Sequence, residues 1–205
     1  MQPEIPGIAG YEAEAAELMT RYESLTFEHV HRGALALYPE SPSDVLDVGA
    51  GTGRDAAALA QRGHRVVAVE PTRALREAGE RLHAGLGIDW VDDHLPTLRK
   101  LRARGTRFDL VLLTAVWMHL DLAERAAGIA TLAALLTEGG HLVMSLRHGP
   151  VPQGRRMFEV SADETIALAA AHGLACHLHF ERESSWPAAD VRWSVLALRR
   201  TGRTG

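Results

Sequence analysis

The residues best placed to bind a ligand lie in a short stretch of alternating glycines. An apolar run at Val45–Val48 leads into Gly49, Gly51 and Gly53. Glycine lets the backbone turn sharply and lets a ligand approach main-chain N–H groups at the start of a helix. The stretch therefore predicts a ligand-binding turn between a strand and a helix. The alternative is a tight strand-to-helix turn that holds no ligand.

A carboxylate that suits a nucleoside follows the second apolar run. Glu70 comes 19 residues after Gly51, directly behind Arg65–Val69. A carboxylate accepts hydrogen bonds from a ribose diol and repels a phosphate, so Glu70 favours adenosine over a 2′-phosphorylated nucleotide. A dinucleotide fingerprint is missing, because G-x-G-x-x-G would need glycine at Arg54. The alternative role of Glu70 is to stabilise only the N-terminus of the next helix.

Short apolar runs that must position these residues alternate with helical patterns. The runs lack polar alternation, as expected for strands covered on both faces. They lie at Val45–Val48, Arg65–Val69, Ile88–Val91, Leu110–Leu113 and Leu142–Leu146. The helical patterns lie at Asp55–Arg62, Ala74–Ala84, Thr97–Arg104 and Leu122–Leu136. This alternation predicts an α/β fold with a parallel sheet, whose ligand site lies at the carboxyl ends of the strands.

The last third of the chain has a different pattern. A helical segment at Ala162–His172 ends at Gly173, and strand-like runs follow at Ala175–Glu181 and Arg192–Leu198. The connection between these runs is too short for a crossover helix, so we expect the two strands to pair antiparallel. The sequence therefore predicts a seven-stranded, mostly parallel sheet with one antiparallel strand near the C-terminus.

The first forty residues form a separate segment. Apolar and aromatic residues recur there at helical spacing, at Tyr11, Ala15, Leu18 and Tyr22. Pro39–Pro42 then breaks the chain before the first strand. We predict a helical lid over residues 1–40, packed on the ligand-binding edge of a main domain over residues 41–205. Helix packing without a lid function is the alternative.

Composition excludes several classes of protein. The 205 residues are 46% hydrophobic and 23% charged, which is ordinary for a folded globular chain. With 22 basic and 26 acidic side chains the net charge is −4, so nothing indicates binding to nucleic acid. Cys176 has no intrachain disulfide partner, and no stretch approaches the roughly 18 apolar residues that span a bilayer. We expect a cytoplasmic protein without a secretory signal or a membrane segment.

The motif Asp47-x-Gly49-x-Gly51-x-Gly53 resembles motif I of the class I S-adenosylmethionine-dependent methyltransferases. Four further motifs follow in the order of that family: the acid after the second strand, an acidic turn after the third, the fourth strand with its loop, and a glycine turn before the fifth. The resemblance covers roughly Asp44 to Leu198. It implies a Rossmann-like three-layer sandwich and S-adenosyl-L-methionine as the cofactor.

The resemblance also implies the roles of individual residues. Glu70 would accept both ribose hydroxyls, and either Asp92 or Asp93 would accept from the adenine amino group. The loop after the fourth strand would line the methionine end of the cofactor. The implied cofactor-binding residues are Asp47, Gly49, Ala50, Gly51, Thr52, Gly53, Arg54, Glu70, Pro71, Asp92, Asp93, His94, Thr114, Ala115 and Val116.

Catalytic candidates lie in the loops after the fourth and fifth strands. Methyl transfer is an in-line displacement, so a general base is required only for a protonated acceptor. His119 has a suitable unperturbed pKa for this role, with a structural histidine held by its own loop as the alternative. Arg147 and His148 stand where the chain leaves the sheet, which favours them as catalytic candidates.

Arginines flank a loop that is rich in proline and glycine. Arg147, Arg155 and Arg156 lie around Gly149–Gly154, which we interpret as a flap. Guanidinium groups bind carboxylates and phosphates, so an anionic acceptor is one hypothesis, and solvated arginines are the other. No metal is predicted, because Thr114 stands where metal-dependent relatives of the catechol type place an acid.

These observations favour methyl transfer to a small molecule through an O, N or S acceptor atom. Nucleic-acid methyltransferases that act on amino groups carry a Pro-Pro-aromatic signature after the fourth strand, where this chain has Ala115-Val116-Trp117. A protein methyltransferase and a non-catalytic S-adenosylmethionine-binding module are the alternatives. The acceptor and the oligomeric state stay open.

Overall fold

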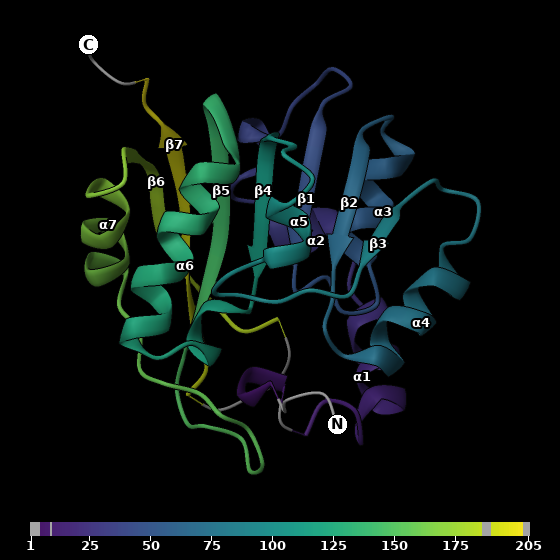
Figure 1. Ribbon diagram of the computed structural model, residues 1–205. Coiled ribbons are helices and arrows are strands. Elements are labelled where there is room, and N and C mark those ends of the chain that lie inside the picture. The colour runs from purple at the N-terminus through teal and green to yellow at the C-terminus, as the bar shows by residue number, and fades with distance from the viewer. Residues whose placement is uncertain (1–4, 9, 186–189, 203–205) are drawn as a thin grey trace.

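A seven-stranded sheet organises the structure, a computed structural model that describes residues 5–8, 10–185 and 190–202. The strand order is β3-β2-β1-β4-β5-β7-β6 (Figure 1). The strands are β1 (Asp44–Val48), β2 (Arg65–Val69), β3 (Asp89–Val91), β4 (Phe108–Thr114), β5 (Leu136–His148), β6 (Leu174–Glu183) and β7 (Arg192–Arg200).

The first five strands run parallel, and β7 runs antiparallel to both β5 and β6. This confirms the predicted seven-stranded, mostly parallel sheet. The reversed strand is β7, which lies between β5 and β6. The connection from β6 to β7 is too short for a crossover helix, so β7 pairs antiparallel with the adjacent β6. The Rossmann-like class is also confirmed.

Helices cover both faces of the sheet and form the outer layers (Figure 1). One core packs α5, α6 and α7 against the sheet, and a second packs α2 and α3 against its other face. A smaller cluster joins α1 to the start of α4. The helices are α1 (Ala15–Glu23), α2 (Phe27–His31), α3 (Arg54–Gln61), α4 (Arg73–Leu82), α5 (Arg99–Arg102), α6 (Leu122–Leu135) and α7 (Ala162–Ala170), with 3₁₀ turns η1 (Pro6–Ile8), η2 (Leu35–Leu37) and η3 (Trp117–His119).

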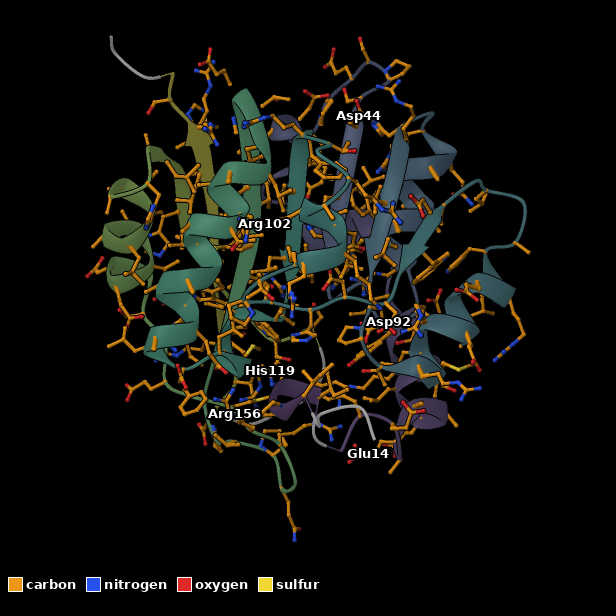
Figure 2. The ribbon with its side chains drawn as sticks, in the orientation of Figure 1. Glu14, Asp44, Asp92, Arg102, His119 and Arg156 are labelled. Carbon is orange, nitrogen blue, oxygen red and sulfur yellow. The ribbon has the colours of Figure 1, made fainter. Side chains whose placement is uncertain are left out.

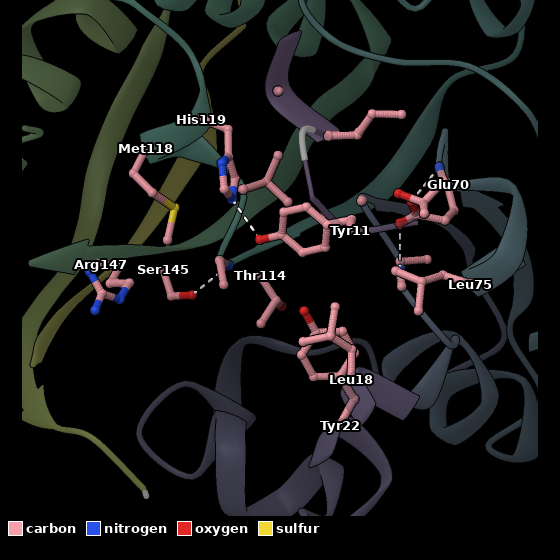
Figure 3. Close-up of a pocket in the computed structure, with 18 of the residues that line it drawn as sticks. Tyr11, Leu18, Tyr22, Glu70, Leu75, Thr114, Met118, His119, Ser145 and Arg147 are labelled. Carbon is pink, nitrogen blue, oxygen red and sulfur yellow. Dashed lines mark hydrogen bonds between the residues drawn. The ribbon is translucent and has the colours of Figure 1, made fainter. Parts of the chain in front are cut away.

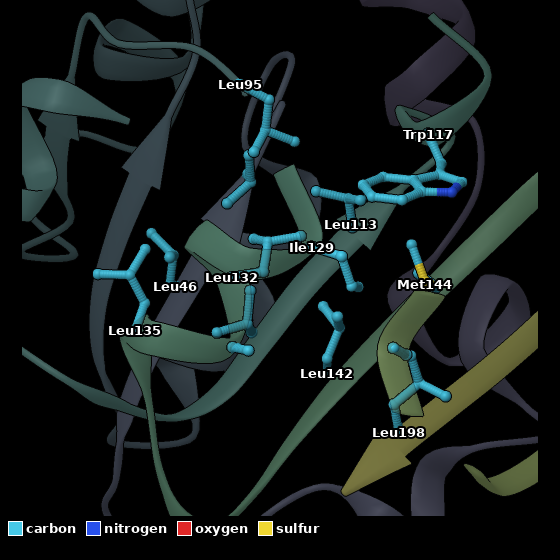
Figure 4. Close-up of a cluster of buried hydrophobic side chains, with 14 of the residues drawn as sticks. Leu46, Leu95, Leu113, Trp117, Ile129, Leu132, Leu135, Leu142, Met144 and Leu198 are labelled. Atoms are coloured by element: carbon cyan, nitrogen blue, oxygen red, sulfur yellow. The ribbon is translucent and has the colours of Figure 1, made fainter. Parts of the chain in front are cut away.

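Buried aliphatic side chains from the central strands fill the larger core. Leu46, Leu113 and Leu142 are fully buried there, beside Ile129 and Leu132 of α6 (Figure 4). Alternate residues of the same strands point to the opposite face of the sheet, where Val45, Leu110 and Val143 form part of the second core and are also apolar. Burial on both faces explains why these strands carry uninterrupted apolar runs.

Two predicted elements differ from the observed ones by more than the few residues seen elsewhere. The helix predicted over Thr97–Arg104 is the single turn α5, which follows Leu98 in the left-handed region with φ 42°. A left-handed residue cannot continue a right-handed helix, so the helix begins after it. The fifth strand starts at Leu136, well before the predicted Leu142, because β5 runs on through Gly139 and Gly140 with an irregular register against β4.

The carboxyl ends of the five parallel strands meet at one edge of the sheet, the lower edge in Figure 1. The first elements of the chain, η1 and α1, lie beneath this edge. No helix in the described part of the chain is long and apolar enough to cross a membrane.

Candidate functional site

A cavity of about 370 Å³ opens at the carboxyl ends of the strands, lined by residues of the sheet edge and of the N-terminal segment. Most residues predicted to form the site line it. These are Asp47, Gly49, Ala50, Gly51, Thr52, Arg54, Glu70, Pro71, Asp93, His94, Thr114, Ala115, Val116, His119 and Arg147. Three predicted site residues do not line it: Gly53, Asp92 and His148.

The glycine turn has a backbone that only glycine adopts readily. Gly49 and Gly51 have φ of +71° and +60°. A Cβ at Gly49 would lie 2.4 Å from Cγ2 of Val116, so the loop after β4 packs directly on this turn. The main-chain N–H groups of Gly49 and Ala50 donate to the carbonyl of Val69 at 2.8 and 3.0 Å, which holds the turn against β2.

The N-terminal segment packs over the same turn. The Tyr22 ring lies 3.4 Å from where a Cβ of Gly51 would stand. The Thr52 hydroxyl donates to Glu23 at 2.6 Å. Tyr11, Leu18 and Tyr22 point into the cavity (Figure 3). Residues between 5 and 23 that the structure describes therefore supply one wall of the cavity, as a lid would.

Glu70 is a buried carboxylate held by main-chain donors. Its Oε2 accepts from the N–H of Gly51 at 2.8 Å, and its Oε1 accepts from the N–H of Thr72 at 2.7 Å (Figure 3). Burial raises the pKa of Glu70. A carboxylate has about four acceptor positions, so both oxygens can accept further hydrogen bonds from a diol in the cavity.

Two more buried carboxylates, Asp47 and Asp55, meet behind the glycine turn. Oδ2 of Asp47 is buried without a hydrogen-bond partner among the described residues. Burial raises the pKa of Asp47 well above its usual range, and the neighbouring Asp55 raises it further. Asp47 is therefore suited to accept from a cationic group of a ligand.

Asp55 has the opposite environment. His31 Nε2 lies 2.9 Å from its carboxylate, Arg54 Nε lies at 2.8 Å, and the Thr114 hydroxyl donates to it at 3.0 Å. Burial alone would raise the pKa of Asp55, but His31 and Arg54 outweigh this and hold it far below its usual range. Asp55 is thus a stabilised anion, whereas Asp47 keeps one buried oxygen without a hydrogen-bond partner among the described residues.

The acidic turn after β3 separates Asp92 from Asp93. Asp93 is buried at the cavity, and its oxygens accept from the N–H groups of His94 at 2.9 Å and Leu101 at 3.0 Å. Asp92 faces the surface, where Lys100 Nζ lies 3.3 Å away (Figure 2). The structure therefore places Asp93, and not Asp92, beside the cavity.

Gly53 has a packing role next to the cavity. A Cβ there would lie 2.6 Å from the Trp90 ring, and the residue begins α3 with φ +85°. The sequence could not separate Gly53 from the glycines that face a ligand, because all three share the same turn.

His119 is joined to Tyr11 across the cavity (Figure 3). Nδ1 of His119 lies 2.8 Å from the carbonyl oxygen of Arg156, and Nε2 lies 2.9 Å from the Tyr11 hydroxyl. A carbonyl only accepts, so Nδ1 carries the proton and Nε2 accepts from Tyr11. Burial lowers the pKa of His119, with the nearby arginines adding to this. The imidazole is therefore neutral near pH 7 with its acceptor nitrogen facing the cavity.

His148 lies outside this arrangement. Its Nε2 is 2.8 Å from the Ser194 hydroxyl, between β5 and β7. Alternate residues of a strand point to opposite faces, so Arg147 lines the cavity while the adjacent His148 does not. The sequence showed that both residues end the strand, but it did not show which of them faces the ligand edge.

Two of the three arginines around the predicted flap are paired with carboxylates. Arg156 binds Glu124 at 2.8 Å and Asp121 at 3.2 Å, beside His119 (Figure 2). Arg155 binds Glu14 at 2.6 Å, and its guanidinium lies 4.1 Å from the centre of the Tyr11 ring. Arg155 therefore ties the N-terminal segment down, and Arg156 holds the His119 loop in place.

Sequence analysis missed several residues that line the cavity, among them Arg182 and Trp193 of the last two strands. Their signal was weak, because an arginine and a tryptophan on an outer strand pair are ordinary surface residues. The described residues contain no group of three or more histidine, cysteine or acidic side chains arranged to hold a metal ion.

The strand order, the antiparallel seventh strand and the glycine turn at the cavity together define the class I S-adenosylmethionine-dependent methyltransferase fold. A family model described as a methyltransferase domain matches residues 45–140. Residues 45–140 of this chain are therefore similar to a methyltransferase domain, and members of the class with this fold use S-adenosylmethionine as the cofactor.

Curated relatives and solved structures agree with this assignment. A demethylmenaquinone methyltransferase from Clavibacter sepedonicus is 29% identical over 169 residues, which cover 78% of this chain and 66% of the relative. An uncharacterized methyltransferase from Alkaliphilus oremlandii is 26% identical over 64% of this chain and 56% of its own length. The chain thus spans less than two thirds of the matched relatives' lengths.

Among solved structures, a TehB-like SAM-dependent methyltransferase from Corynebacterium glutamicum aligns with a TM-score of 0.70 at 20% identity, over 92% of this chain and 99% of that one. Magnesium protoporphyrin IX methyltransferase from Synechocystis with bound SAM aligns with a TM-score of 0.62 at 17% identity, over 94% of this chain and 80% of that one. At these identities the likeness concerns the fold.

The residues present fit the cofactor of the class. Gly49 and Gly51 line the cavity with main chain alone, Glu70 has acceptor capacity for a ribose, and Asp47 has a buried oxygen without a hydrogen-bond partner among the described residues. An ammonium group of the methionine moiety would satisfy Asp47.

Proposed function

We propose that this chain transfers a methyl group from S-adenosylmethionine to a small molecule. The observation that carries the proposal is that most of the predicted cofactor residues and the Tyr11–His119 pair line one and the same cavity. Its volume, about 370 Å³, is within the usual range for small-molecule sites. The likeness to a demethylmenaquinone methyltransferase supports a small acceptor.

The cofactor supplies an electrophilic methyl group on a sulfonium. The chain holds the reactants in line and excludes water, since Tyr11, Leu18 and Tyr22 cover the cavity. His119 in its neutral form takes the proton of a protonated acceptor at Nε2, once the Tyr11 hydroxyl yields that position. Thr114 and Ala115 line the cavity at the end of β4.

The single, exposed Cys176 is the ground on which we propose a cytosolic location.

Calorimetry with S-adenosylhomocysteine tests the cofactor site first. Glu70→Gln should weaken binding roughly tenfold or more, because one charge-assisted acceptor of the ribose is lost. Glu77→Gln is the matched control, since Glu77 is exposed on α4 and paired with Arg73. Failure of the wild-type protein to bind S-adenosylhomocysteine would overturn the proposal.

Incubation of the protein with tritiated S-adenosylmethionine and cell extract tests the reaction. We expect label in the small-molecule fraction. Label in protein would instead identify a protein methyltransferase, and binding without any labelled product would identify a non-catalytic module.

The role of His119 is tested by steady-state kinetics with the methyl acceptor, after the labelled product has identified it. His119→Gln should lower kcat by roughly 100-fold or more for a protonated acceptor. The wild-type rate should fall as the pH drops through a pKa below the usual value near 6.5, because only neutral imidazole accepts a proton. His172→Gln, at an exposed site after α7, is the control. An unchanged kcat in His119→Gln would contradict a role of His119 as general base and would show that it is only a structural residue.

A further inference from the structure

Three residues from different strands form a row at the edge of the cavity. Arg147 of β5 pairs with Trp193 of β7, and Trp193 pairs with Arg182 of β6. Residues directly opposite each other on antiparallel strands project to the same face of a sheet. All three line the cavity. Neighbouring strands lie about 4.8 Å apart, so the backbones of Arg147 and Arg182, which are two strands apart, are separated by roughly 10 Å. Trp193 stands on the strand between them.

Neither arginine of the row has an acidic partner among the described residues. Arg147 Nη1 donates to the carbonyls of Pro150 at 2.9 Å and Gly149 at 3.3 Å. Among the described residues, the hydrogen bonds of Arg182 are long, at 3.4 Å to the carbonyl of Glu183 and 3.5 Å to the Ser185 hydroxyl, and its Nε is buried without a hydrogen-bond partner. Its guanidinium carbon lies 5.5 Å from the centre of the Trp193 ring. Arg155 and Arg156, by contrast, are each paired with a carboxylate.

The surroundings of the row are electropositive. Burial lowers the pKa of Arg182, and the positive charges of Arg32 and Arg54 lower it further. Burial likewise lowers the pKa of Arg147. Partly buried cations without a counter-charge are unfavourable unless a ligand compensates them. A guanidinium group offers paired N–H donors that match the oxygens of a carboxylate or phosphate.

We propose that Arg147 and Arg182 form an anion subsite that binds a carboxylate or phosphate group of the methyl acceptor, with the Trp193 ring packing on its apolar part. This inference rests on the proposed function, because it takes the cavity to hold the acceptor beside the cofactor. It also changes the assignment of the arginines: Arg155 and Arg156 are engaged within the protein, and Arg182, from the far end of the sequence, takes their place.

Matched pairs of small ligands test the subsite on the protein saturated with S-adenosylhomocysteine. Suitable pairs are benzoate with benzamide, phenylacetate with phenylacetamide, and glycerol 3-phosphate with glycerol. Dissociation constants are measured by calorimetry or ligand-observed NMR. At least one anion should bind roughly tenfold tighter than its neutral partner, as expected for a charge-assisted contact.

Variants then assign the effect to the row. Arg147→Gln and Arg182→Gln should each remove most of the preference for the anion and leave the affinity for S-adenosylhomocysteine unchanged. Arg182→Lys should retain part of it, because the charge stays while the planar fork is lost. Arg192→Gln is the control: this exposed neighbour of Trp193 does not line the cavity and should behave as the wild type.

Three results would overturn the subsite: no anion binds better than its neutral partner, both glutamine variants keep the preference, or Arg192→Gln loses it equally. The comparison of ligand pairs uses the wild-type protein and so holds even for a variant that fails to fold. Loss of S-adenosylhomocysteine binding by the wild type would contradict the proposed function itself, which distinguishes the two failures.

Discussion

At the scale of single residues, two neighbouring carboxylates have opposite environments. Asp55 is surrounded by His31, Arg54 and Thr114, which hold its pKa far below the usual range. Asp47 has a buried oxygen that no described group satisfies, and burial raises its pKa. An unsatisfied charge lowers stability in the free protein and becomes useful only when a cationic ligand binds. Asp47 therefore has the properties of a functional residue.

Replacement of Asp47 by asparagine should separate stability from binding. A raised folded-state pKa means that the native protein holds this proton more tightly than the unfolded chain, whose pKa is about 3.9. Below the unfolded-state pKa, Asp47 is protonated in both states and does not destabilise the folded protein. The free energy of unfolding then falls as the pH rises through the folded-state pKa of Asp47, where the buried carboxyl loses its proton. Asp47→Asn should raise the Tm of the free protein by roughly 2–4 °C at pH 8 and by nothing at pH 3.

The same variant should bind S-adenosylhomocysteine about tenfold more weakly, because an ammonium group loses its anionic partner. Asp163→Asn, at an exposed position in the first turn of α7, serves as the control for both measurements. A lower Tm at pH 8 together with unchanged affinity would show that Asp47 is only a structural residue.

At the scale of elements, the turn between β1 and α3 depends on space as well as on backbone conformation. Gly49 and Gly87 have nearly equal φ, +71° and +70°. A Cβ at Gly49 would lie 2.4 Å from Val116, whereas a Cβ at Gly87 would have no heavy atom within 4 Å. The two glycines therefore separate the cost of the left-handed backbone from the cost of a clash.

Alanine at each position should give different losses of stability. Gly87→Ala should lower the free energy of unfolding by about 1–2 kcal/mol, the cost of a left-handed backbone. Gly49→Ala should lower it by about 1–3 kcal/mol more, because the methyl group overfills a packed site. Val116→Ala in the Gly49→Ala background should recover part of the extra loss. Denaturant unfolding measures all three, and equal losses at Gly49 and Gly87 would refute the packing argument.

At the scale of the whole molecule, the N-terminal segment and the sheet share the cavity between them. Ala15 and Leu18 pack on Leu75 at the start of α4, while Thr52 and Glu23 join the N-terminal segment to the glycine turn. If this segment acts as the predicted lid, a ligand that contacts both parts should stabilise it against local opening.

Hydrogen exchange should report this coupling. Saturation with S-adenosylhomocysteine at about 100 times its Kd should slow exchange in α1 by up to about 100-fold, the limit set by RT ln(1 + [L]/Kd). The exchange rates of the α7 amides, which lie away from the cavity, should fall only for those amides that exchange through global unfolding. Equal protection of α1 and α7 would mean that the lid does not open separately.

The amino-acid pattern was enough to predict the sheet and the position of the glycine turn at its ligand-binding edge. Uninterrupted apolar runs encode strands buried on both faces, and Gly49, Gly51 and Glu70 lie within short stretches whose chemistry is local. Spacing along the chain therefore sufficed to predict the fold, and most of the site residues predicted in this way line the cavity.

Only the tertiary structure decided which side chains face that cavity together. It joined Tyr11 to His119, separated Asp93 from Asp92, and directed Arg147 inward while His148 turned away. It also brought Arg182 into register with Arg147 through β7. These juxtapositions depend on strand pairing and on the alternation of side chains across the sheet, and residues distant in sequence meet only when the chain folds.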